Sequence, residues 1–121
     1  MDFDTELKYQ DTKKKLEEIF GGGMDEQVIL FLIGVQELGR GFRTFSKDEK
    51  MNLMHVAICT LLEPYGYYRF DGKDDDGWPH FETLKKLPPL DKREQQDLIK
   101  IAIIEYFEKE GLGSIEDLKT S

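Results

Sequence analysis

The sequence predicts a mainly α-helical fold, a compact bundle of about four helices around a buried second helix, in a single globular domain over residues 1–121. Three observations predict it: four apolar stretches, capping residues or glycines at their ends, and an aromatic, aspartate-rich stretch typical of a β-hairpin between the third and fourth helices. A chain of 121 residues is long enough to bury one hydrophobic core.

The first two helices are predicted from their apolar residues and their ends. The first spans about Thr5 to Phe20, carries a sparse apolar stripe and is followed by three glycines that end it. The second begins after Asp25, a good N-cap, and extends to about Arg43. Its run VILFLIGV at 28–35 is apolar on every side, which predicts a helix buried all round. A buried strand would give the same run, and periodicity alone does not separate the two.

The third and fourth helices begin with the same capping arrangement. Ser46 and Glu49 form a capping box, in which each side chain accepts a hydrogen bond from the other residue's backbone N–H. Pro64 ends the third helix, because a residue before proline is disfavoured in the helical region. Asp91 and Glu94 repeat the arrangement at the start of the fourth helix.

The stretch between these helices predicts a β-hairpin. YGYYRF at 65–70 and WPHFETL at 78–84 are rich in aromatic residues that favour strands, and DGKDDDG at 71–77 joins them. Pro79 restricts its strand to an edge, or must itself be the first residue of the strand. A two-stranded hairpin is marginal alone, so we expect its rings to pack on the helices.

The hairpin carries more aromatic residues than one buried face can use. Strand alternation places rings on both faces, whereas a helical body covers only one of them. Tyrosine and tryptophan at this density are typical of interfaces. We therefore expect a small, soluble, non-enzymatic protein-interaction module whose partner is another protein or a second copy in a homodimer. Its predicted interaction surface consists of Tyr67, Tyr68, Arg69, Phe70, Trp78 and His80.

A first alternative is a divalent-cation site in the acidic loop 71–77. Asp74, Asp76 and Glu82 are the candidate ligands, since calcium prefers carboxylate oxygens. The loop does not match an EF-hand, because two anchor ligands are missing when Gly77 takes the invariant glycine position. Consecutive aspartates also point in different directions along an extended chain. We therefore predict a solvated hairpin tip and assign no metal.

The two histidines and the single cysteine are candidates for a zinc site or for a Cys–His nucleophile. His55 and Cys59 lie four residues apart on the predicted third helix, so they share a face, and only His80 remains as a further histidine. Because the surrounding residues are apolar, we predict that Cys59 behaves as a small hydrophobic residue. No catalytic residue and no cofactor is assigned.

A second alternative is a small-molecule binder or an enzyme. Its pocket would lie between the hairpin and the helices, where a few polar groups converge on an apolar hollow. The lining residues expected for such a pocket are Tyr67, Arg69, Trp78 and His80.

Charge and composition exclude several classes of protein. The net charge of −8 repels phosphate backbones, so we expect no nucleic-acid partner. The longest apolar run has eight residues, whereas a membrane span needs about 20, so we expect no membrane partner. One cysteine allows no intramolecular disulfide, and the N-terminus has no apolar signal segment. We expect a cytoplasmic protein.

Overall fold

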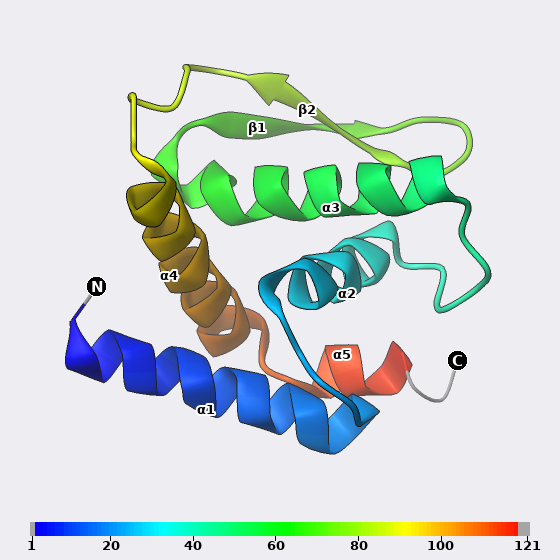
Figure 1. Cartoon of the computed structure of the whole chain (residues 1–121). Helices are drawn as coiled ribbons and strands as arrows, with labels where there is room; N and C mark the ends of the chain where they lie inside the picture. Colours follow the sequence, from blue (N-terminus) through cyan, green and yellow to red (C-terminus); the bar gives the residue numbers. More distant parts are fainter. Residues whose placement is uncertain (1, 119–121) are drawn as a thin grey trace.

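The structure, a computed structural model, describes residues 2–118 and confirms a mainly α fold with a two-stranded antiparallel hairpin between the third and fourth helices (Figure 1). A single turn of 3-10 helix, η1, follows the third helix, and a short fifth helix follows the fourth. In chain order the elements are α1 (Phe3–Phe20), α2 (Glu26–Leu38), α3 (Lys47–Leu62), η1 (Glu63–Tyr65), β1 (Tyr68–Lys73), β2 (Pro79–Thr83), α4 (Lys92–Glu110) and α5 (Gly113–Asp117).

The elements form a stack in which α3 separates the hairpin from the other helices. The hairpin lies along one side of α3, and both strands contact that helix (Figure 1). Helix α2 packs on the opposite side of α3, and α5 packs on α2. Helix α4 runs down one side of the stack and contacts both α3 and α1. The hairpin is therefore an outer layer that packs mainly on α3.

Helix α2 supplies much of the core but differs from its prediction in two ways. It ends at Leu38 and not near Arg43, because Gly39 takes the left-handed conformation (φ 74°, ψ 21°) and its N–H donates to the Val35 carbonyl. It is also not buried all round, since Val28 keeps 36% of its surface exposed. The residues that it does bury are Ile29, Leu30, Leu32, Ile33, Gly34, Val35 and Leu38.

Helices α2 and α3 meet at Gly34. A Cβ atom added to Gly34 would lie 2.2 Å from the backbone oxygen of Leu53 and 2.9 Å from its Cβ. Leu53 is completely buried. The two helices therefore approach each other so closely that only glycine fits at this position of α2.

The strand register places the aromatic residues of the strands on one face. Phe70 lies opposite Phe81, and their rings meet edge-on with centroids 5.7 Å apart. Tyr68, two residues before Phe70, contacts the His55 ring of α3, so this face is turned toward the helix. The opposite face carries the ion pair of Arg69 with Glu82. At this position the second face carries charged residues, while Tyr67, two residues before Arg69, lies beside the end of the strand with Lys85 over its ring. Rings on both faces of the hairpin therefore remain a prediction.

The ends of the hairpin follow the sequence only in part. Pro79 is the first residue of β2, as its missing N–H requires. The first strand begins at Tyr68 and extends to Lys73, so it includes residues that had been expected in the loop. A bulge between Phe70 and Lys73 accommodates the extra residues.

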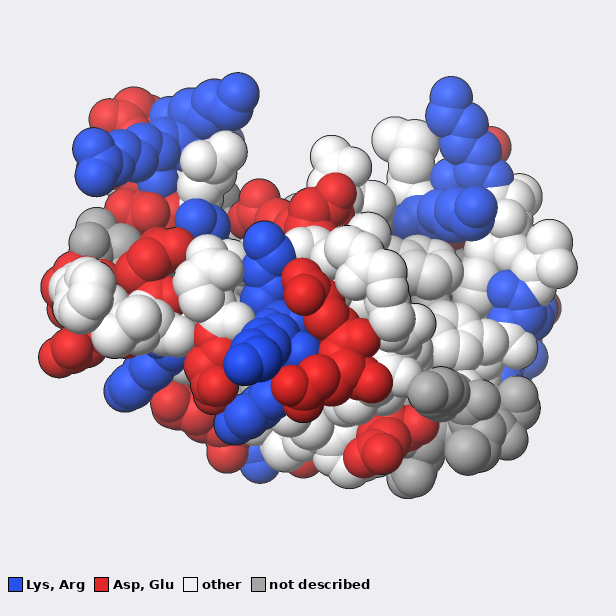
Figure 2. Space-filling model, turned by 60° about the horizontal axis from the view of Figure 1, so that its bottom comes forward, with Lys and Arg blue, Asp and Glu red and all other residues white. Residues whose placement is uncertain are grey.

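The surface opposite the hairpin is a mixture of charges. Figure 2 brings forward the face on which α1 and α5 lie, and basic and acidic side chains are interspersed over it. One pair on α1, Lys15 with Asp11, lies at 3.0 Å. Within residues 2–118, no helix is both long and apolar enough to cross a membrane.

The close approach at Gly34 predicts that Gly34→Ala destabilises the protein. Overpacking of this kind costs about 1–3 kcal/mol, whereas alanine regains only about 1 kcal/mol of helix propensity. Because the obstructing atoms belong to the Leu53 backbone, we expect a lower free energy of unfolding in urea. Gly23→Ala is the control, since Gly23 has open space around its Cβ position. Equal effects of the two substitutions would contradict the contact.

Candidate functional site

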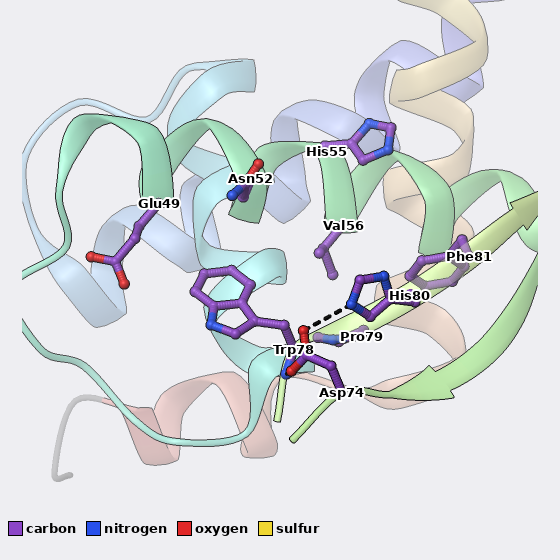
Figure 3. Close-up of a pocket in the computed structure, with 9 residues that line it drawn as sticks. All are labelled: Glu49, Asn52, His55, Val56, Asp74, Trp78, Pro79, His80 and Phe81. Carbon is purple, nitrogen blue, oxygen red and sulfur yellow. Dashed lines mark hydrogen bonds and ion pairs between the residues drawn. The ribbon is translucent and has the colours of Figure 1, made fainter. Parts of the chain in front are cut away.

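Two grooves lie beside the hairpin, and Pro79 and Phe81 line both of them. The first, which we call the Trp78 groove, has a volume of about 420 Å³ and lies between α3 and the turn end of the hairpin (Figure 3). Its lining residues are Glu49, Asn52, His55, Val56, Asp74, Trp78, Pro79, His80 and Phe81.

The second, which we call the glutamate groove, consists of two adjoining hollows of about 430 and 330 Å³ between the hairpin, α2, α3, η1 and α4. The two hollows share Glu37, Thr60 and Glu63. Phe70 lines the hollow nearer to the hairpin. The glutamates that line the groove are Glu37, Glu63, Glu105 and Glu110.

Asp74 organises the turn beside the Trp78 groove. Its Oδ1 accepts the backbone N–H groups of Asp76 and Trp78, each at 3.0 Å, and its Oδ2 lies 2.8 Å from His80 Nε2. The His80 hydrogen bond, followed by the bonds from the backbone, lowers the pKa of the Asp74 carboxyl. One carboxylate therefore holds both the Trp78 backbone and the His80 ring.

The turn is also supported from the loop after α2. Gly77 has a φ of +86°, and a Cβ added there would lie 2.4 Å from Arg40 Nη2. The backbone conformation therefore favours glycine at this position, and the Arg40 guanidinium lies beside it. Residues 73–76 of the turn are exposed, as the prediction of a solvated hairpin tip requires, while Gly77 at its end is partly covered by Arg40.

The predicted interaction surface is divided by the structure. Trp78 and His80 line the Trp78 groove, and Phe70 lines the glutamate groove. The other three lie in neither groove: Lys85 sits over the Tyr67 ring at 4.7 Å, Tyr68 contacts His55, and Arg69 pairs with Glu82. Of the four residues expected to line a pocket, Trp78 and His80 do so, whereas Tyr67 and Arg69 do not.

The three candidate cation ligands have separate surroundings. Asp74 binds His80, and Glu82 binds Arg69 on the outer face of the hairpin. Asp76 contributes its backbone N–H to Asp74. Within the described part of the chain, no group of three or more histidine, cysteine, aspartate or glutamate residues is arranged to hold a metal ion.

Cys59 and His55 are neighbours, but the thiol is not reactive. The Cys59 Sγ lies 3.5 Å from His55 Nε2, and the cysteine is completely buried. Burial raises the pKa of the Cys59 thiol to about 11, so it stays protonated at neutral pH. His55 and His80 line the same groove, whereas Cys59 lies behind it in the core.

Three glutamates of the glutamate groove are held by uncharged donors. Glu37 Oε2 accepts the Tyr106 hydroxyl at 2.8 Å, and Glu105 Oε1 accepts the Tyr65 hydroxyl at 2.5 Å. Glu63 Oε2 accepts the backbone N–H of Phe70 at 2.6 Å. Such bonds orient a carboxylate without neutralising its charge.

The same glutamates have no cation beside them. Among residues 2–118, none of the four lies within ion-pair distance of a lysine or arginine. Lys73 and Lys109 also line the groove but remain farther away. Burial raises the pKa of Glu37, and the charges of Glu110 and Glu63 raise it further, while the Tyr106 hydrogen bond and the more distant charge of Lys73 oppose them.

Most of the residues that line the two grooves were not predicted from the sequence. Glu49, Asn52 and His55 follow the Ser46 cap on one face of α3, but nothing in their spacing indicates a hairpin above them. The four groove glutamates come from α2, η1 and α4, so no local pattern joins them. The one available signal was the excess of acidic residues in the whole chain.

We predict that Asp74→Ala exposes Trp78 to water. The substitution removes the acceptor for the Trp78 N–H and for His80, so the turn should loosen. Trp78 is the only tryptophan in the chain, so its fluorescence maximum should move to longer wavelength. Asp75→Ala is the control, one residue along the same turn. Unchanged emission in Asp74→Ala would show that other contacts hold the indole.

We also predict that Glu37→Gln raises the melting temperature at neutral pH. A carboxyl whose pKa is raised in the folded state favours folding below its usual value of 4.5, and this contribution is lost as the pH rises through the folded-state pKa. Glutamine keeps the acceptor for Tyr106 without the charge. The difference in melting temperature should therefore disappear below about pH 4.5. Glu18→Gln, on the exposed side of α1, should have little effect at either pH.

Comparison with protein-family models, with curated proteins and with solved structures gives no match for this chain. The function of the chain is therefore inferred from the residues of the two grooves, their charges and their exposed rings.

Proposed function

We propose that the protein is a non-enzymatic interaction module that binds a basic, partly apolar segment of a partner protein in the glutamate groove. The observation that carries the proposal is the group of four glutamates without an ion-pair partner along the groove, two of which, Glu37 and Glu63, share a hollow with the exposed ring of Phe70. The buried charge of Glu37 and the exposed ring of Phe70 are unfavourable in the isolated protein and become favourable when such a segment covers them.

The charge of the groove supports a basic partner. Four carboxylates face two lysines along its length, and the whole chain carries a net charge of −8. Complementary charge raises the rate of association and disfavours acidic partners. Because Tyr65, Tyr106 and the Phe70 N–H already orient three of the carboxylates, a lysine or arginine of the partner meets acceptors that are in place.

The ring of Phe70 supports a partly apolar partner. Phe70 lies on the face of the hairpin that is turned toward α3, yet 48% of its surface remains exposed, since the groove opens beside it. Its edge-on contact with Phe81 limits its movement. Covering this ring removes apolar area from water at about 25 cal/mol per Å². An aromatic anchor ringed by polar groups is typical of the centre of an interface.

Two further observations support a binding role in the cytoplasm. The Cys59 thiol is buried and protonated, so it is not available as a nucleophile. A free thiol as the only cysteine suits a reducing compartment.

The proposal predicts that an amphipathic peptide of lysine and leucine at helical spacing binds to the glutamate groove. Amide NMR spectra of the labelled protein should show shifts at Glu63, Phe70 and Glu105. Phe70→Ala should weaken binding about tenfold, since an aromatic anchor contributes about 1–2 kcal/mol. Phe3→Ala should have no effect, although Phe3 is 76% exposed on α1.

A pair of double variants tests the charge with the net charge held equal. Glu105→Gln with Glu110→Gln should weaken peptide binding about threefold to tenfold, as expected for exposed ion pairs. Asp4→Asn with Glu18→Gln removes two exposed carboxylates from α1 and should leave the affinity unchanged. Equal losses in both double variants would mean that the peptide responds only to overall charge, and the proposal would fail. Concentration-dependent dimerisation that Phe70→Ala abolishes would replace the partner with a second copy of the chain.

A further inference from the structure

The Trp78 groove differs from the other hollows of the structure in its charge. Two carboxylates, those of Glu49 and Asp74, line it, and no lysine or arginine does. Each of the other hollows described along the chain includes at least one lysine in its wall. A ligand that enters the Trp78 groove therefore meets two carboxylates and no lysine or arginine in the lining, which disfavours an anion.

The walls of the groove consist largely of rings. Trp78, His80 and Phe81 come from the hairpin side, and His55 comes from α3 (Figure 3). Trp78 stands between the Glu49 side of the groove and the Asp74–His80 pair (Figure 3). The face of an aromatic ring is the negative end of its quadrupole, and tryptophan attracts cations most strongly. Aromatic rings beside carboxylates can bind an organic cation even when that cation donates no hydrogen bonds.

Both carboxylates are held in position. Asp74 is fixed by two backbone N–H groups and by His80. Glu49 Oε1 accepts the Ser46 N–H at 2.9 Å, and its Oε2 lies 3.1 Å from Arg43 Nη2. Arg43 does not line the groove, but its ion pair with Glu49 offsets part of that carboxylate's charge. The aromatic rings must therefore supply a large share of the attraction for a bound cation. The groove is therefore suited to a bulky, weakly hydrated cation more than to a metal ion.

The size of the groove agrees with a small organic ligand. Its volume of about 420 Å³ lies within the range of about 300–1,000 Å³ that small-molecule sites occupy. Val56 and Pro79 add apolar surface to the lining. Methyl groups around a central nitrogen can contact this surface and the ring faces at the same time.

We propose that the Trp78 groove binds a quaternary ammonium group, carried either by a small molecule or by a trimethylated lysine side chain. The proposal goes beyond the partner-binding function and depends on different residues. It needs Trp78, Glu49 and Asp74, whereas the proposed partner segment needs Phe70 and the four groove glutamates.

Titration with choline, followed by Trp78 fluorescence, tests the proposal. We expect saturable quenching or a spectral shift, because Trp78 is the only tryptophan and lines the groove. The neutral isostere 3,3-dimethyl-1-butanol has the same shape without the charge and should bind at least about tenfold more weakly, as a cation–π interaction of about 1–2 kcal/mol requires. N-acetyltryptophanamide corrects for collisional quenching, and sodium chloride keeps the ionic strength constant.

Matched variants locate the binding site. In Trp78→Leu, choline-induced shifts of the Asn52 and His55 amides in NMR spectra should require about tenfold more choline. Phe3→Leu should bind choline like the wild-type protein. Glu49→Gln keeps an acceptor for the Ser46 N–H, and it should weaken binding severalfold while the melting temperature stays nearly constant.

A second probe distinguishes between a trimethylated lysine side chain and a small molecule as the source of the ammonium group. Tighter binding of Nα-acetyl-Nε-trimethyllysine methylamide than of choline would assign the groove to a modified protein side chain, and the reverse would assign it to a small molecule. Equal binding of choline and its neutral isostere would overturn the proposal. So would the absence of any saturable response to either ammonium probe. Neither result bears on the peptide experiment, since Phe70 and Glu105 lie outside the Trp78 groove.

Discussion

The close approach of α2 and α3 at Gly34 is the contact on which the rest of the structure depends. Because the backbone of α2 lies against the carbonyl of Leu53, no side chain separates the two helices at this position. The opposite side of α3 is then free to carry the hairpin, and α2 is free to carry α5. A wider separation would displace Glu37 on α2 from Thr60 on α3, and the glutamate groove includes both.

The hairpin on this base creates two grooves of different chemistry. Asp74 and Arg40 hold its turn, so the position of Trp78 is set by contacts within the hairpin and with the loop after α2. Pro79 and Phe81 separate the two grooves. One groove has rings and no lysine in its lining, and the other has glutamates oriented by uncharged donors. A single two-stranded element thus borders two grooves without a core of its own.

The glutamate groove keeps two groups in states that the isolated protein does not favour. Burial penalises the charge of Glu37, and Phe70 keeps 48% of its surface exposed. Local departures of this kind from the best arrangement for stability tend to concentrate at functional sites. They support the view that a positively charged ligand or segment completes the surface, because such a partner both stabilises the carboxylates and covers the ring.

The sequence by itself determined the features that depend on near neighbours. Asp25, Ser46 and Asp91 cap their helices as predicted, because a cap needs only residues three positions away. The hairpin and the position of Pro79 at the start of β2 follow from the same local rules.

Only the tertiary structure decided which face of the hairpin is covered and which residues share a groove. Strand alternation predicts two faces but not that Arg69 pairs with Glu82 on one of them. Glu37 and Glu105 meet beside the hairpin although 68 positions separate them in the printed sequence. Contacts over such separations depend on how helices stack, and helix stacking depends on close packing, such as that at Gly34, which no local pattern encodes.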